Sequence, residues 1–127
     1  MSQYHYPVPL FESRLTVMVG EGEVPDIMRA HKVPPPGGFK AARAGVMEYP
    51  WPKGSVDAMT SRGGWLVVIH PEADIKLIAH ESTHVAYYIA AWHHLALGEE
   101  NEETVCYLVG WAAQCIQDAI DRYNGIV

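Results

Sequence analysis

The segment His80-Glu81-Ser82-Thr83-His84 has residue types and spacing that suit a metal-dependent reaction. On a helix, two histidines four residues apart project from one face, about 40° apart around the axis and about 6 Å along it. A single ion can therefore lie between their imidazoles. Glu81 is about 100° from His80 around such a helix, so it would stand beside the ion. We expect it to act as the general base that activates a zinc-bound water.

The third metal ligand must come from another part of the chain. Zinc suits two imidazoles and a carboxylate, and a position left to water lowers the pKa of that water to about 7. Glu102 and Glu103 open the next expected helix, and either could supply the carboxylate. Helix phase favours Glu103, because Tyr107 and Gly110 lie within about 40° of it and would supply a hydroxyl and close helix packing. Glu102 would then serve as a favourable charge at the helix N-terminus. The expected ligands of one Zn²⁺ per chain are His80, His84 and Glu103.

The first part of the chain, residues 1–70, reads as short strands and loops. Eight of the nine prolines and eight of the eleven glycines precede Pro71. Apolar, β-branched runs predict strands at 14–19 and at 64–69, the second buried on both faces. The remaining expectations for this part are a short helix at 25–31 with Pro25 in its first turn, a loop at 34–38, and an extended edge segment at 39–49.

Residues 71–127 read as a helix pair that carries the metal ligands. The composition predicts helices at about 73–94 and 101–123, the second with Asn101 as its N-cap. A connection of about six residues favours antiparallel neighbours. We therefore predict one α+β domain, residues 1–127, in which a small sheet packs on the helix of residues 80–84 and a glutamate-bearing helix closes the site.

The metal-ligand segment resembles a known family. His80 to His84, followed by eighteen residues and then Glu103, is similar to the gluzincin class of zinc peptidases, in which HExxH supplies two ligands and a glutamate on the next helix supplies the third. The stretch Asn101-Glu102-Glu103-Thr104-Val105-Cys106-Tyr107-Leu108 is also similar to a segment of short HExxH proteins, many of them phage-encoded. The resemblance implies a minimal zincin-like fold and a metallopeptidase that cleaves a peptide or amide bond.

The resemblance also implies a residue that stabilises the transition state. Large gluzincins place it in a C-terminal domain, whereas 24 residues follow Glu103 here. We expect Tyr107 in this role, with His70 and Tyr49 as the other candidates. The alternative function is a non-catalytic, zinc-stabilised binding or effector protein, for instance a phage-derived one, that acts on a host protein.

Composition narrows the partners and the location. The net charge is −6 and the nine basic residues are scattered, which disfavours nucleic-acid binding. No run of 18 apolar residues or export signal is present, so we expect no membrane partner. Two cysteines, Cys106 and Cys115, are expected as unpaired, buried residues, which fits the cytoplasm, or the host cytoplasm for a phage protein. The expected partner is a peptide or protein substrate, and the oligomeric state stays open.

Other candidate residues have simpler roles. His93 and His94 would lie about 20 Å along the helix from His80 and are expected at a solvated helix end. Tyr87 and Tyr88 could line a cleft, but we favour a core position for both.

Overall fold

The computed structural model describes residues 2–9, 11, 13–35, 42–49 and 64–126, and within them it shows an α+β fold. The expected fold class is therefore confirmed. In chain order the elements are β1 (Gln3–Pro7), β2 (Arg14–Val19), α1 (Val24–Ala30), β3 (Ala44–Glu48), β4 (Gly64–Ile69), α3 (Ile75–Trp92), the short 3₁₀ helix η2 (Glu99–Asn101) and α4 (Glu102–Tyr123).

The sheet has the strand order β1-β2-β4-β3. The central strands β2 and β4 are parallel, and β1 and β3 are antiparallel edge strands. Both strands predicted from apolar runs are confirmed. The predicted edge segment is confirmed over Ala44–Glu48. Residues 39–41 of that segment and residues 36–38 of the predicted loop lie outside the described part. Strand β1 was not predicted.

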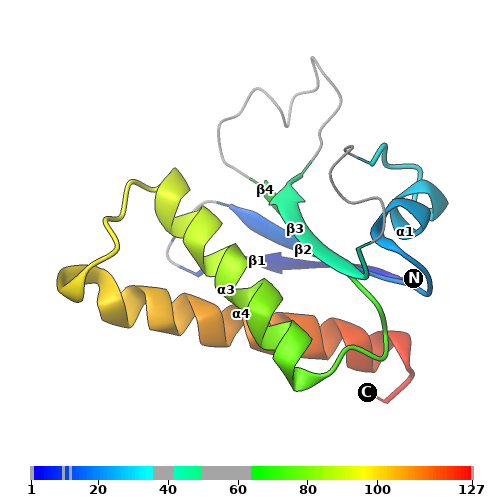
Figure 1. The fold of residues 1–127 in the computed structure, drawn as a ribbon. Helices are drawn as coiled ribbons and strands as arrows, with labels where there is room; N and C mark the ends of the chain where they lie inside the picture. The colour runs from blue at the N-terminus through cyan, green and yellow to red at the C-terminus, as the bar shows by residue number, and fades with distance from the viewer. Residues whose placement is uncertain (1, 10, 12, 36–41, 50–63, 127) are drawn as a thin grey trace.

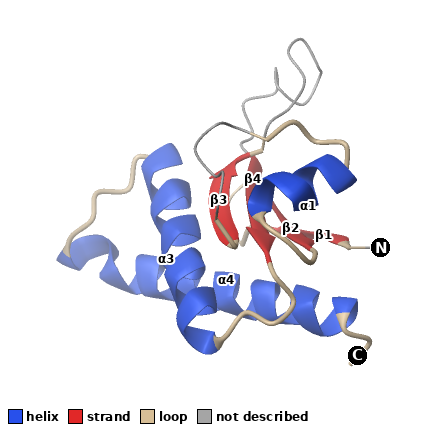
Figure 2. Ribbon diagram, turned by 45° about the vertical axis from the view of Figure 1, so that its right-hand side comes forward, coloured by secondary structure: helices blue, strands red, loops and turns tan. Residues whose placement is uncertain are grey.

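The sheet lies between two helical layers, with α3 and α4 on one face and α1 on the other (Figures 1 and 2). Side chains alternate across β4, so Trp65 and Val67 face the helix pair while Leu66 and Val68 face α1. All six residues of β4 are buried, as predicted for this strand. Helix α1 has Pro25 in its first turn, which was also predicted.

Helix α3 begins after Asp74, whose Oδ1 accepts a hydrogen bond of 2.9 Å from the backbone N–H of Leu77. It runs to Trp92, and η2 and α4 then return beneath it so that the two helices cross (Figure 1). Asn101 precedes α4 as expected, but its side-chain amide donates to the carbonyl of Ala96 instead of capping α4. None of the described helices is long and apolar enough to cross a membrane.

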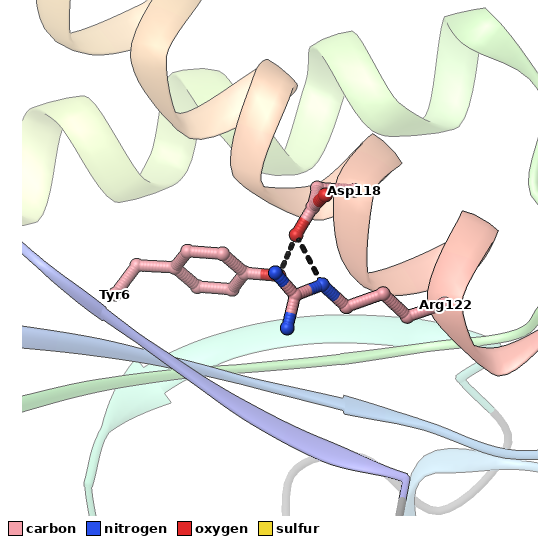
Figure 3. Close-up of polar contacts among 3 residues, drawn as sticks. All are labelled: Tyr6, Asp118 and Arg122. Atoms are coloured by element: carbon pink, nitrogen blue, oxygen red, sulfur yellow. Dashed lines mark hydrogen bonds and ion pairs between the residues drawn. The ribbon is translucent and has the colours of Figure 1, made fainter. Parts of the chain in front are cut away.

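A polar cluster joins strand β1 to helix α4 (Figure 3). The Tyr6 hydroxyl donates to Oδ2 of Asp118 at 2.7 Å, and the same oxygen lies 2.9 Å from Nε of Arg122. Burial raises the pKa of Tyr6, and the bond to Asp118 raises it further, so the phenol stays neutral and donating. The cluster therefore fixes the edge strand β1 to the helix layer.

The cysteines differ from the expectation in one respect. Cys115 is buried, and burial raises its pKa to about 12, but Cys106 is exposed on α4. Neither forms a disulfide.

The prediction of a solvated helix end at His93 is wrong. Its ring stacks on Phe11 with centroids 3.9 Å apart, and its Nε2 is buried without a hydrogen-bond partner among the described residues. Burial lowers the pKa of His93 below the ordinary value of 6.5, and the neighbouring His94 lowers it further.

We therefore expect acid to destabilise the protein through His93. Its pKa is lower in the folded state than in the unfolded state, so the unfolded chain takes up the proton first as the pH falls below 6.5. This loss of folding stability is absent at pH 8, and it grows as the pH falls until the folded-state pKa of His93 is reached. Between pH 8 and pH 5, the free energy of unfolding measured with urea should fall less for His93→Phe than for the wild type.

His94→Asn measures the smaller contribution of the neighbouring imidazole, which also lowers the pKa of His93. It should change the pH dependence less than His93→Phe does, and asparagine tolerates the φ of 57° at this position. An equal pH dependence in wild type and His93→Phe would contradict the assignment.

Candidate metal centre

Helix α3 holds the two histidine side chains together on its exposed face. The Nε2 atoms of His80 and His84 are 3.2 Å apart, and the ring centroids are 4.8 Å apart. Two nitrogen ligands about 2.05 Å from a tetrahedral zinc would be separated by about 3.3 Å. The spacing of the two nitrogens therefore fits two coordination positions of one zinc ion.

Glu81 lies beside this pair but is buried, with 5% of its surface exposed. Burial raises the pKa of its carboxyl, while the nearby His80 and His84 act in the opposite direction. A carboxyl with a raised pKa is a better proton acceptor than an exposed one. Its position and its burial both suit a general base.

The two residues inside the motif bond to the backbone of their own helix. The Ser82 and Thr83 hydroxyls donate to the carbonyls of Ile78 and Ala79, four residues earlier, at 2.6 and 2.8 Å. Both side chains are satisfied locally, so they take no part in holding a metal.

A hollow of about 420 Å³ lies between α3 and the edge strand β3. Both histidines and Glu81 line it from the helix, and the opposite wall is backbone and small side chains of the strand. The lining residues are Ala42, Ala44, Gly45, Val46, His80, Glu81, His84 and Tyr88. The hollow places the motif opposite the sheet edge.

The structure does not bring a third ligand to the histidine pair. Among the described residues, no group of three or more His, Cys, Asp or Glu side chains could hold a metal ion. Glu103 and Tyr107 are exposed, and a Cβ on Gly110 would meet nothing within 4 Å. The prediction that this stripe packs against α3 is therefore wrong. Apolar residues, from Leu108 onward, form the stripe of α4 that faces the core.

The first turn of α4 presents the other glutamate toward α3. Glu102 lines a second hollow, of about 320 Å³, together with Tyr87 of α3 and Cys106 of α4. Tyr87 lies about 20° from His80 around the α3 axis, so this side of α4 is the one nearer the histidine face. Both glutamates remain candidates for the third ligand. Glu103 is supported by its eighteen-residue spacing from His84, and Glu102 is supported by the phase that α4 has in the structure.

The candidates for transition-state stabilisation do not line the hollow beside the histidines. Tyr107 is 58% exposed on α4. His70 lies in the turn after β4, where its Nδ1 accepts a hydrogen bond from the backbone N–H of Glu72. Tyr49 lies under the guanidinium of Arg14, 5.8 Å from the ring centroid, and packs against the α1 side of the sheet.

Tyr88 is a site residue that the sequence analysis assigned to the core. It is 42% exposed, and Tyr87 is 50% exposed, so a core position is wrong for both. Tyr88 lines the hollow with the histidines and stacks on Trp65 of β4. Its spacing was an overlooked signal, since it follows His84 by four residues and therefore shares its helix face.

No protein-family model, curated protein or solved structure matches the chain.

Replacing each of the two glutamates separately should identify the third ligand. The eighteen-residue spacing from His84 predicts that Glu103→Ala weakens zinc binding by roughly 100-fold or more, because a ligand is lost. This result requires the first turn of α4 to rotate toward the histidine pair when zinc binds. Glu102→Ala should cost only a few tenths of a kcal/mol of helix stability. The zinc dissociation constants of the two variants decide between them. A larger loss for Glu102→Ala would mean that α4 keeps its present phase when zinc binds.

Proposed function

We propose that this chain is a zinc-dependent hydrolase, a metallopeptidase that cleaves a peptide or amide bond. The observation that carries this proposal is the 3.2 Å separation of the His80 and His84 Nε2 atoms on the wall of a hollow that Glu81 also lines. The two imidazoles would supply two of the three zinc ligands, and the buried carboxyl beside them would supply the base that such hydrolysis requires.

His80 and His84 would hold the zinc, with a glutamate from the first turn of α4 as the third ligand. When bound, zinc supplies Lewis acidity, which polarises a carbonyl and lowers the pKa of water. Glu81 is not a ligand in this scheme. Its carboxylate accepts the proton of the attacking water and then delivers it to the leaving amine.

The sheet edge supplies the means of holding an extended substrate. Strand β3 is last in the strand order, so its outer backbone groups pair with no strand of the described residues. A peptide added antiparallel or parallel to this edge would run along the hollow, past the histidine pair. Backbone hydrogen bonds to β3 would then position the scissile bond.

The alternative function is a non-catalytic, zinc-stabilised binding protein. A structural zinc site is closed by four protein ligands and leaves no position for an activated water. In that case the same hollow would serve for contact alone.

Zinc-dependent cleavage of peptides tests the proposed function. Protein stripped by a chelator is supplied with one equivalent of zinc and incubated with a peptide mixture from a glutamate-specific digest, which keeps internal arginine and lysine. New termini are identified by mass spectrometry. Cleavage should require zinc and should stop when the chelator is restored. One bound zinc per chain with no new termini would favour the binding protein.

A further inference from the structure

A larger hollow of about 520 Å³ continues from the candidate metal centre along the same edge strand. It shares Val46 of β3 and Tyr88 of α3 with the hollow that holds the histidines. Its lining residues are Val46, Met47, Glu48, Trp65, Tyr88, Ala91 and Trp92. A chain lying along β3 past the histidines would therefore place a side chain in or over this second hollow.

Three aromatic side chains form an ordered wall of this hollow. Trp65 stacks on Tyr88 with centroids 5.9 Å apart and an interplanar angle of 6°, and Trp92 meets Trp65 edge-on at 5.8 Å and 80°. Trp65 is 4% exposed, whereas Tyr88 and Trp92 are 42% and 38% exposed. The indole of β4 thus holds two accessible aromatic rings in place, with little rotamer freedom left to lose on binding.

Glu48 is the charged residue in the lining. It is directly opposite Trp65 in the antiparallel β3–β4 register, so both side chains project from the same face of the sheet. Glu48 is exposed, and no ion pair is found for it among the described residues. An aromatic wall beside an exposed carboxylate attracts a cation through both the ring faces and the negative charge.

We propose that this hollow is a specificity subsite for a basic side chain of the substrate, with arginine favoured over lysine. The aliphatic stem would lie on the aromatic wall while the guanidinium pairs with Glu48. Arginine is favoured because its planar group stacks on aromatic rings and bonds a carboxylate through two N–H groups. The net charge of −6 would assist the approach of a basic peptide.

This inference rests on the proposed function, because the peptide path along β3 leads from the metal centre to the second hollow. Peptide binding tests the subsite and peptide cleavage tests the hydrolase, so each proposal can fail without the other. Binding uses the Glu81→Gln protein with one equivalent of zinc, in which peptides are not consumed. Cleavage uses the unaltered protein.

The probes are eight-residue peptides, acetylated and amidated, that differ at one central position. That residue is arginine, lysine, citrulline, norleucine or phenylalanine. Citrulline keeps the shape of arginine without its charge, and norleucine keeps only the aliphatic stem. The dissociation constants should rank arginine tightest, about five- to tenfold below citrulline, since a partly exposed cation–π contact and ion pair contribute this much together.

Glu48→Gln should remove most of the preference for arginine over citrulline, and Trp92→Leu should weaken binding of both. Glu21→Gln is the matched control, because it removes one exposed carboxylate outside the lining. An unchanged arginine-to-citrulline ratio in Glu48→Gln, tighter binding of norleucine or phenylalanine than of arginine, or no binding of any peptide at millimolar concentration would overturn the subsite. Arginine-selective binding without cleavage would leave the subsite standing and overturn the hydrolase.

Discussion

Glu81→Gln should retain zinc and fold while losing about 100- to 10,000-fold in hydrolysis rate, the usual contribution of a general base. Glutamine has the shape of glutamate but cannot take up the proton of the attacking water. The buried position of Glu81 already disfavours its charged form, so a neutral amide should not destabilise the helix. The turnover number on a cleaved peptide, zinc content and the urea midpoint measure the three expectations.

Glu72→Gln is the control for this variant, since it changes an exposed glutamate that precedes α3. It should behave as the wild type in all three measurements. An unchanged turnover number in Glu81→Gln would remove the base from the mechanism. Loss of zinc together with activity would instead make Glu81 a ligand.

The double variant His80→Ala, His84→Ala should lose zinc affinity by more than about 1,000-fold, because two of the three expected ligands are removed. Both imidazoles are exposed, so the metal-free protein should keep its fold and its stability. The wild type and the double variant should differ in stability only after zinc is added. Zinc at 100 times its dissociation constant should stabilise the wild type by about 2.7 kcal/mol and leave the double variant unchanged.

A second double variant, His70→Ala with His94→Asn, removes the same number of imidazoles away from the lining of the histidine hollow. It should bind zinc as the wild type does. Full zinc occupancy in His80→Ala, His84→Ala would mean that the bound metal lies elsewhere in the chain.

The elements that were predicted well from the sequence are those whose residues show one clear pattern of hydrophobicity. The run at 64–69 is apolar at every position, which suits a strand covered on both faces and little else. Strand β1 was missed because QYHYP is polar and ends in proline. Its only signal is the two-residue alternation of Tyr4 and Tyr6, both of which pack against the helix-side core.

The phase of α4 shows why the third ligand was not located from sequence. The stripe from Glu103 through Tyr107 and Gly110 was given a packing role because close approach of the helices would offset the cost of a glycine inside a helix, about 1 kcal/mol. Burying one leucine or isoleucine contributes about 1.5–3 kcal/mol. Leu108, Ile116 and Ile120 therefore turn α4 so that their side faces the core, and the glutamate stripe faces outward.

Within the site, the histidine pair was predictable because a single turn of helix fixes its geometry. The hollow required knowledge of the tertiary structure, since Gly45 and Glu81 are brought together across the sheet edge. Glu48 and Trp65 likewise become neighbours only through the strand register.

The parallel pairing of β2 with β4 has a consequence for the order of folding. It joins Arg14 to Gly64, which are fifty positions apart in the chain, so a long loop must close before the centre of the sheet exists. Helix α3 needs only neighbouring residues, and it already holds both imidazoles. We expect the histidine pair to form early, while the wall opposite it waits for the slowest step, the long-range closure of the sheet.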